Sequence, residues 1–251
     1  MSAHDLLEGR TIIVTGAATG IGQAFAVGCG EQGANVVAAD MNPSEETVAK
    51  VEAAGGTAIA VEVDVSDDAS TRAMADAALE RFGRIDGLVN NAAYFREVRL
   101  TPFEEIDPAI WDRIFAVNVK GVWLCCKAVL PAMREQGTGS IVNIASVVAV
   151  AGQPGYLHYV ATKGSVLSMT KGLAKEVGAH GVRVNVIAPG WIETSFGEGV
   201  DEQVRRSVAD STPLKRWGTP DDVAGAAVYL ASPAADFLTG QTIMVGGGLV
   251  M

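Results

Sequence analysis

The sequence of 251 residues predicts one α/β domain, residues 1–251, in which helices flank a doubly wound sheet of about seven mainly parallel strands. Three observations predict this class. Short apolar runs alternate with amphipathic stretches, a glycine-rich turn joins the first run to the first helix, and polar residues follow the ends of successive runs. The sequence has no internal repeat, low-complexity segment or linker, so a single domain is expected.

The alternation defines each expected element. The apolar runs that predict strands are Arg10–Val14, Asn35–Ala39, Thr57–Val63, Asp86–Val89, Ser140–Ile144, Val182–Ile187 and Thr242–Val245. Helices are expected after Gly22 and over Glu45–Ala54, Ala69–Phe82, Ile110–Met133, Tyr159–His180 and Asp221–Ala231. Strands that alternate with helices form βαβ units, in which the strands are parallel. Residues of about 191–213 have no strong period, which predicts a long loop or a helical lid over the site.

A glycine-rich turn follows the first strand. It reads Thr15-Gly16-Ala17-Ala18-Thr19-Gly20-Ile21-Gly22, and the residues after it have helical spacing. Glycines allow a tight turn, and they let a pyrophosphate approach the amides at the start of the helix. Strand, turn and helix together favour a dinucleotide site over an ordinary turn. The residues expected to contact the dinucleotide are Gly16, Thr19, Gly20, Ile21 and Gly22.

Asp40 ends the second strand, eighteen residues after Gly22. A carboxylate at this place can accept hydrogen bonds from the adenosine ribose hydroxyls and would repel a 2′-phosphate. Thr19 and Met41 offer no positive charge to such a phosphate, so the sequence predicts NAD rather than NADP. The alternative is that Asp40 only caps the turn that follows it.

Tyr159 and Lys163 are four residues apart in a predicted helix and therefore face the same side, one turn apart. A nearby ammonium favours the phenolate, so the pKa of Tyr159 is expected to fall below its ordinary value of about 10. Tyr159 would then exchange a proton with a substrate oxygen that Ser146 holds. The pair by itself is weak support, because this spacing occurs by chance in many helices.

The ends of the predicted strands add support for a functional site. Six strands end at or just before a glycine, proline or polar residue, namely Gly16, Asp40, Asp64, Asn90, Ser146 and Pro189. Parallel strands have their carboxyl ends at one edge of the sheet, and doubly wound sheets bind ligands there. These residues are therefore expected to gather at one site.

Composition excludes several other classes. A net charge of −10 disfavours nucleic acid and anionic membranes as partners. The three cysteines lie in helix-like segments and fit a reducing cytoplasm better than a disulfide framework. The three histidines lack the spacing of metal ligands, and no metal is expected. No signal-like segment opens the sequence, and the apolar runs look too short to span a membrane.

From Arg10 to Gly248 the sequence resembles the short-chain dehydrogenase/reductases, a family with a Rossmann-type fold. The matching marks are Thr15-Gly-x-x-x-Gly-Ile-Gly22, Asp64-Val65, Asn90-Asn91-Ala92, Asn118, Ser146, Tyr159-x-x-x-Lys163 and Pro189-Gly190 with Thr194. The sequence departs from the family pattern at two places: Ala93 stands where Gly is usual, and Gly246 where Asp is common.

The resemblance implies roles for the matching residues. Tyr159 would be the general acid/base, Ser146 would orient the substrate oxygen, and Lys163 would hold the nicotinamide ribose. Asn118 would support a water that links Lys163 to solvent. The remaining cofactor contacts that the resemblance implies are Asp64, Val65, Asn90, Ala92, Pro189, Gly190, Ile192 and Thr194. The family also implies a homotetramer, in which the two long helices Ile110–Met133 and Tyr159–His180 form one interface.

Apolar and aromatic residues beside the catalytic positions are candidates for the substrate pocket. With Ser146, they are Tyr94, Val148, Gln153, Tyr156, Trp191 and Phe196, and Phe95 lies next to Tyr94. Such a wall suits a ketone or secondary alcohol with an apolar substituent, although any one of these residues could equally be packing.

Three functions remain open. The first is an NAD-dependent oxidoreductase that acts on a secondary alcohol or ketone. The second is a reductase of 3-oxoacyl thioesters of acyl carrier protein or coenzyme A, against which Asp40 counts because reductive biosynthesis usually draws on NADPH. The third is a dinucleotide-sensing protein without turnover, against which the intact set of Ser146, Tyr159 and Lys163 counts.

Overall fold

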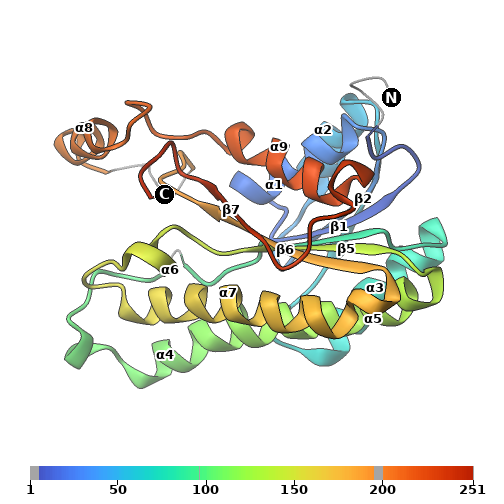
Figure 1. Cartoon of the computed structure of the whole chain (residues 1–251), viewed down its shortest axis with the longest axis horizontal. Helices are drawn as coiled ribbons and strands as arrows, with labels where there is room; N and C mark the ends of the chain where they lie inside the picture. Colours follow the sequence, from blue (N-terminus) through green and yellow to red (C-terminus); the bar gives the residue numbers. More distant parts are fainter. Residues whose placement is uncertain (1–5, 96, 195–199, 251) are drawn as a thin grey trace.

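Seven parallel strands form one sheet in the order β3-β2-β1-β4-β5-β6-β7 (Figure 1). The structure is a computed structural model that describes residues 6–95, 97–194 and 200–250. The strands are β1 (Thr11–Thr15), β2 (Asn35–Asp40), β3 (Thr57–Glu62), β4 (Gly87–Asn90), β5 (Gly139–Ile144), β6 (Val182–Pro189) and β7 (Thr242–Val245). The predicted class, a doubly wound Rossmann-type sheet, is confirmed, and every strand pair is parallel.

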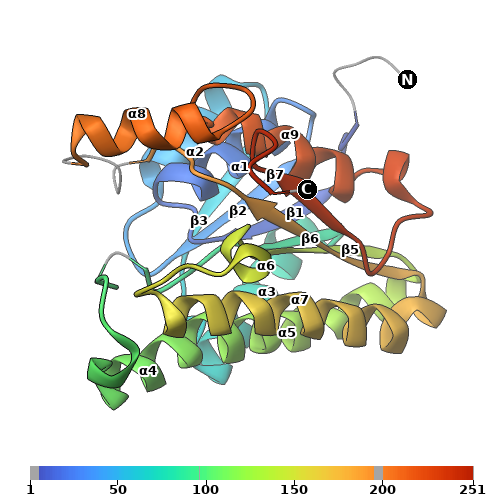
Figure 2. The ribbon, with the colours of Figure 1, turned by 60° about the vertical axis from the view of Figure 1, so that its left-hand side comes forward.

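Helices cover both faces of the sheet (Figures 1 and 2). One face carries α1 (Gly20–Gly30), α2 (Glu45–Ala53) and α9 (Pro220–Ala231), and the other carries α3 (Asp68–Phe82), α5 (Val122–Gln136) and α7 (Leu157–Val177). Successive strand residues alternate between the two layers, as the pleat requires. Ile12 and Val14 pack in the core under α1 and α9, whereas Ile13 packs in the core on the other side.

The predicted long helix over Ile110–Met133 is three segments in the structure. α4 (Pro108–Phe115) continues through a π-helical turn, η2 (Ala116–Gly121), into α5. In the part of the chain that the structure describes, this continuous stretch, Pro108–Gln136, is long and apolar enough to cross a membrane by length and composition. Half of its most apolar window is buried inside the fold, and core helices of globular proteins pass the same test.

Periodicity did not predict the short elements. They are α6 (Val148–Ala151), α8 (Glu202–Ser211) and the single 3-10 turns η1 (Phe103–Glu105), η3 (Gly178–His180) and η5 (Pro233–Ala235). α8 lies within the predicted lid and stands out from the body of the molecule in Figure 2. The role of residues 191–213 as a lid stays a prediction, and residues 195–199 lie outside the described residues.

The three cysteines are buried and free. Burial raises the pKa of the Cys29 and Cys126 thiols to about 12, so neither is a thiolate at neutral pH. Cys125 and Cys126 belong to the core under α5, which agrees with a packing role for the pair.

Candidate active site

Two hollows meet at the carboxyl ends of the strands. The first, here the catalytic cavity, has a volume of about 220 Å³ and is lined by Ser146, Tyr159 and Lys163 with residues from β6 onward. The second, here the nucleotide groove, is lined by residues that follow β1 to β4, among them Gly16, Asp40 and Asp64. Asn91 and Ala93 line both, so the two hollows adjoin each other. Five of the six strand-end residues predicted to converge line these hollows, and Asn90 does not.

Ser146, Tyr159 and Lys163 come from two elements. Ser146 follows β5, and the other two lie one turn apart on α7. The ammonium nitrogen of Lys163 lies over the Tyr159 ring, 5.7 Å from its centroid, and donates a hydrogen bond of 2.8 Å to the carbonyl of Ile144. β5 thus anchors Lys163, and the residues after it place Ser146 beside the phenol.

The pKa of Tyr159 runs opposite to the prediction. Burial raises the pKa of the phenol well above its ordinary value, a hydrogen bond with Ser146 lowers it, and Tyr156 raises it further. Proximity to Lys163 does not offset this burial, and burial also lowers the pKa of the Lys163 ammonium from 10.5 to about 8. Tyr159 therefore keeps its proton at neutral pH and has one to donate, although a pKa this far above neutral makes the phenol a weak acid.

Asn118 lies in the π-helical turn and is buried. Its side-chain oxygen accepts a hydrogen bond of 2.7 Å from the backbone N–H of Tyr94, and its amide nitrogen donates at 3.4 Å to the carbonyl of Tyr94 and to Thr162. Asn118 does not line the catalytic cavity. It ties the loop after β4 to α7, and its role in a proton relay stays a prediction.

The glycine turn is built by close backbone approaches. A Cβ on Gly22 would lie 2.0 Å from the carbonyl oxygen of Gly16, and a Cβ on Gly16 would lie 2.8 Å from the Cα of Ala92. Gly16 and Gly20 also have φ of +68° and +62°, which L side chains rarely adopt. Gly16 and Thr19 line the nucleotide groove and Ile21 lines the catalytic cavity, whereas Gly20 and Gly22 shape the turn.

The start of α1 suits a diphosphate. Thr19 is its N-cap residue but makes no side-chain capping hydrogen bond, which leaves the first amides of the helix free of a side-chain cap. By contrast, Asp67, Asp201 and Thr219 cap α3, α8 and α9 with their own side chains. The turn and the groove therefore fit a dinucleotide.

Asp40 both lines the nucleotide groove and holds the turns around it. One carboxylate oxygen accepts from the backbone N–H of Ala18 at 3.0 Å, and the other accepts from the backbone and side chain of Asn42 at 2.9 and 3.1 Å. The alternative role as a turn cap is thus present. It does not remove the negative charge from the groove, because both oxygens keep capacity to accept.

The other predicted cofactor residues divide between the hollows and the interior. Asp64, Val65 and Ala92 line the nucleotide groove, and Pro189, Gly190, Ile192 and Thr194 line the catalytic cavity. Asn90 lines neither. Its side chain is buried and donates to Asn143 and to the sulfur of Cys126, because the last residue of β4 points into the core beneath α5.

Sequence reasoning missed Asn91, the next residue. Its side-chain amide donates to the carbonyls of Thr15 and Gly16 at 3.1 and 3.0 Å, while the Thr15 hydroxyl accepts from the N–H groups of Asn91 and Ala92. These bonds join the loop after β4 to the glycine turn. The signal in the sequence was the second Asn of Asn90-Asn91, an amide at the end of a strand.

Most of the predicted substrate residues line the catalytic cavity, namely Ser146, Val148, Gln153, Tyr156 and Trp191. Tyr94 does not, because its hydroxyl turns outward to Glu97, and Phe95 lines the cavity in its place. The Phe95 ring lies 4.5 Å from the Tyr159 ring and 6.1 Å from the Tyr156 ring. Phe196 lies outside the described residues. The substrate-binding roles stay predictions.

A family model described as enoyl-(acyl carrier protein) reductase matches residues 16–250. The 3-oxoacyl-[acyl-carrier-protein] reductase FabG of Thermotoga maritima is 39% identical over 247 residues, which cover 98% of this chain and 99% of that protein. The protein of the same name from Staphylococcus aureus is 36% identical over 245 residues, covering 96% and 98%.

Two solved structures are similar over almost the whole chain. A putative short-chain alcohol dehydrogenase from Sinorhizobium meliloti has a TM-score of 0.92 at 39% identity, covering 98% of each chain. A putative 2-deoxy-d-gluconate 3-dehydrogenase from Agrobacterium tumefaciens, with bound NADP, has a TM-score of 0.90 at 37% identity, covering 99% of each chain.

Proposed function

Because the chain belongs to the short-chain dehydrogenase/reductase family, we propose that it is an NAD(H)-dependent oxidoreductase that interconverts a ketone and a secondary alcohol with an apolar substituent. The proposal rests on one observation: Tyr159, Ser146 and Lys163 line the same cavity as a set of aromatic side chains. The nicotinamide supplies or accepts the hydride, and the protein supplies orientation and a proton.

In reduction, the Tyr159 hydroxyl donates its proton to the oxygen of the ketone. The phenol keeps its proton at neutral pH, so it has a proton to donate. Ser146, which shares a hydrogen bond with the phenol, orients the same oxygen. Lys163 is held by Ile144 and offers its remaining N–H groups to the nicotinamide ribose.

The preference for NAD is the finer part of the proposal, and it rests on Asp40. Its carboxylate lies in the nucleotide groove beside Met41 and Asn42, neither of which carries a positive charge. A 2′-phosphate at this place would meet a negative charge without a compensating cation. The NADP-bound relative is 37% identical to this chain, so its cofactor alone does not decide the preference here.

A second candidate function is the reduction of a 3-oxoacyl thioester. The names of the Thermotoga and Staphylococcus relatives favour it over the first candidate. The chemistry at Tyr159 would be the same, and only the group beyond the ketone would differ. The catalytic cavity favours the first candidate, because Lys163 is the one charged side chain among its described lining residues.

The test is the change in nicotinamide absorbance with NADH and with NADPH, against aliphatic, cyclic and aryl ketones and a 3-oxoacyl thioester. We expect NADH-driven turnover of the apolar ketones. Turnover confined to NADPH and the thioester would overturn both the cofactor and the substrate proposals.

Asp40→Asn is the matched variant for the cofactor. It keeps one hydrogen-bond acceptor and removes the charge, so the ratio of kcat/KM with NADPH to that with NADH should rise by about tenfold, or about 1.4 kcal/mol. An unchanged ratio would show that Asp40 acts only as the cap of its turn.

The assembly and the compartment are parts of the same proposal. α5 and α7 lie side by side on one face of the sheet, and α5 exposes Trp123. We expect these helices to pair in a homotetramer, and we expect the protein to act in the cytoplasm on a small molecule. Sedimentation of a monomer at micromolar concentration would contradict the tetramer.

A further inference from the structure

A second cavity of about 240 Å³ lies beyond one wall of the catalytic cavity. Trp191 and Ile192 line both cavities, so they form the wall between them. The far side is formed by the segment before α9 and by the residues that follow β7. The second cavity contains none of the catalytic residues and no residue of the nucleotide groove.

Trp191 is held from two directions. Its carbonyl accepts a hydrogen bond of 2.9 Å from the N–H of Gly218, so its backbone is joined to the segment that precedes α9. Its ring lies 5.4 Å from the ring of Trp217. The indole that separates the two cavities is therefore fixed by packing rather than by a polar contact of its own.

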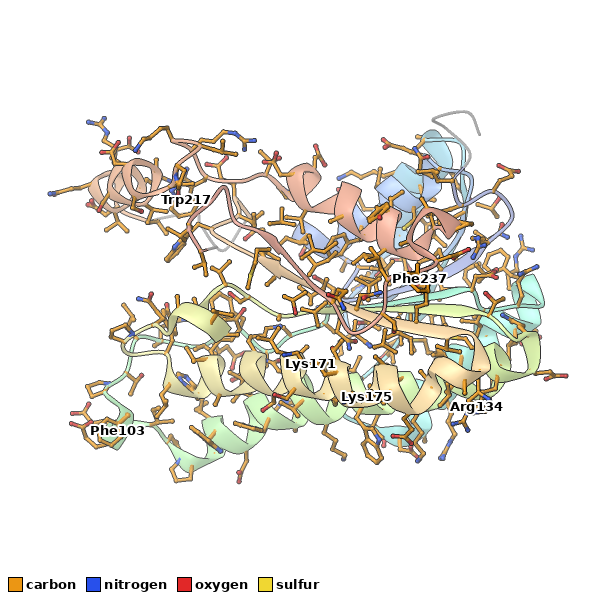
Figure 3. The ribbon with its side chains drawn as sticks, in the orientation of Figure 1. Phe103, Arg134, Lys171, Lys175, Trp217 and Phe237 are labelled. Atoms are coloured by element: carbon orange, nitrogen blue, oxygen red, sulfur yellow. The ribbon has the colours of Figure 1, made fainter. Side chains whose placement is uncertain are left out.

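Trp217 is fixed in turn by α8, beside which it lies in Figure 3. The indole N–H of Trp217 donates to the carbonyl of Arg205 at 3.0 Å, and the Arg205 guanidinium lies 4.8 Å from the centre of the same ring. Arg205 also pairs with Glu193, two residues after Trp191. Arg205, Trp217 and Trp191 thus lie in contact one after another, with the two indole rings tilted at 49°, and the series ends at the wall.

The second cavity has a mixed lining, in which apolar groups lie beside one ion pair. Thr212, Leu214 and Val245 contribute side chains, and Gly246 and Gly247 contribute none. A Cβ on Gly247 would lie 2.7 Å from the methyl carbon of Thr212, so a side chain at this glycine would encroach on the space. Arg216 and Asp222 also line the cavity, but they form a bidentate ion pair with each other and leave no unmatched charge for a ligand.

We propose that Trp191 is the partition that limits how far a substrate extends from the reacting carbon, and that the space beyond it accepts an unbranched apolar chain once the indole is removed. This inference rests on the proposed function. The protein itself therefore accepts compact ketones, cyclic, aryl or short-chain, and rejects long alkyl chains.

The experiment uses methyl ketones of increasing chain length, from butanone to undecanone, with NADH as the reductant. For the unmodified protein, kcat/KM should stop rising at a short chain. In Trp191→Ala it should keep rising, by about fourfold for each methylene that enters the second cavity. Trp191→Phe keeps an aromatic ring in the partition and should keep the limit of the unmodified protein.

A double variant shows whether the second cavity is the space used. Leu214 lines that cavity, and its side chain is largely exposed, so a larger side chain at this position does not disturb the core. Trp191→Ala combined with Leu214→Trp should therefore refill the space and abolish the gain for long chains. Trp191→Leu serves if the alanine variant does not fold. Binding of the same ketones, measured by titration calorimetry, gives the chain-length profile without turnover.

Each outcome is decisive. A limit that moves in Trp191→Ala and returns in the double variant supports the partition. An unchanged profile in Trp191→Ala, a gain that survives Leu214→Trp, or equal use of long chains by the unmodified protein would overturn it. Failure of the proposed function gives a different result. The unmodified protein then reduces no ketone, and the calorimetric chain-length profile still tests the partition.

Discussion

The nucleotide groove and the aromatic wall of the catalytic cavity meet at Ala93, yet they are built in different ways. The groove is shaped by backbone atoms in such close approach that a Cβ on Gly16 or Gly22 would collide with the main chain. The wall is shaped by rings in ordinary contact, Phe95 on Tyr159 and Trp191 on Trp217.

This contrast indicates which part of the site can change. Positions where a Cβ would lie closer than van der Waals distance to the backbone admit only glycine, so the shape of the groove cannot vary without a shift of the main chain. Ring contacts can be exchanged for other apolar contacts at modest cost. Variation in substrate is therefore expected at the wall, while the groove stays constant.

The largest effect is expected where the two regions join. Tyr159→Phe removes the proton donor and should lower kcat by about 10²–10⁴-fold, because that is the usual contribution of a general acid or base. The dissociation constant of NADH, measured by fluorescence titration, should change little. Unchanged turnover would show that another group supplies the proton.

Gly22→Ala tests the groove. The new Cβ would lie 2.0 Å from the carbonyl oxygen of Gly16, and the start of α1 must shift to relieve the clash. We expect a loss of unfolding free energy of about 2 kcal/mol or more and weaker NADH binding. Gly28→Ala, in the same helix, is the control, since its Cβ would lie at an ordinary 3.4 Å from Ala224. Equal effects at the two positions would contradict the close-approach argument.

Lys163→Met tests the cost in folding free energy of burying a charge in the catalytic cavity. Burial lowers the pKa of Lys163 from 10.5 to about 8, so at pH 7 the folded protein holds a proton that burial disfavours. The variant should be inactive yet more stable at pH 7, by roughly 1–3 kcal/mol, since the lost hydrogen bond to Ile144 offsets part of the gain.

The sign of the pH dependence follows from the same shift. Between pH 8 and about 10.5 the unfolded chain binds more protons at Lys163 than the folded protein, so the stability of the unmodified protein rises with pH relative to the variant. Urea unfolding of both proteins at several pH values measures the difference. A constant difference from pH 7 to 10 would contradict the lowered pKa.

The smallest effect is expected at the wall. Phe95→Ala removes a ring that packs against Tyr159 at 4.5 Å, a contact of about 0.5–1.5 kcal/mol. The KM of aryl ketones should rise several-fold while the KM of NADH stays constant. Phe95→Leu keeps the apolar contact and should restore part of the affinity. An equal rise in both KM values would place Phe95 on the cofactor side.

Sequence patterns predicted the residues of the groove better than those of the wall, because the groove depends on glycine positions and the wall on side-chain packing. A turn that admits only glycine leaves a fixed trace in the sequence, as Gly16 and Gly22 do, and the ends of six strands could be aligned from apolar runs alone. The direction of a side chain after a strand could not be predicted in this way. Tyr94 and Phe95 are adjacent aromatic residues, and only three-dimensional packing decides that Phe95 enters the cavity.

The pKa of Tyr159 was predicted in the wrong direction because spacing shows distance along a helix but not burial. Tyr159 and Lys163 are one turn apart, as expected, yet the ammonium lies over the ring and donates to Ile144. Burial of both groups then outweighs their proximity. Likewise, the π-helical turn has no periodic signature that distinguishes it from an α-helix.

The π-helical turn separates α4 from α5 within the continuous helical stretch Pro108–Gln136 and fixes the rotation of one helix relative to the other. A π-helical turn holds one residue more than an α-helical turn, so one residue fewer in Ala116–Gly121 would close it to α-helical geometry and move the side chains within it. Asn118 would then swing away from the backbone of Tyr94, although every residue of the candidate site would still be encoded. A loss of a single codon far from Tyr159 would therefore act as an active-site mutation, one that a residue-by-residue inspection of the gene would miss.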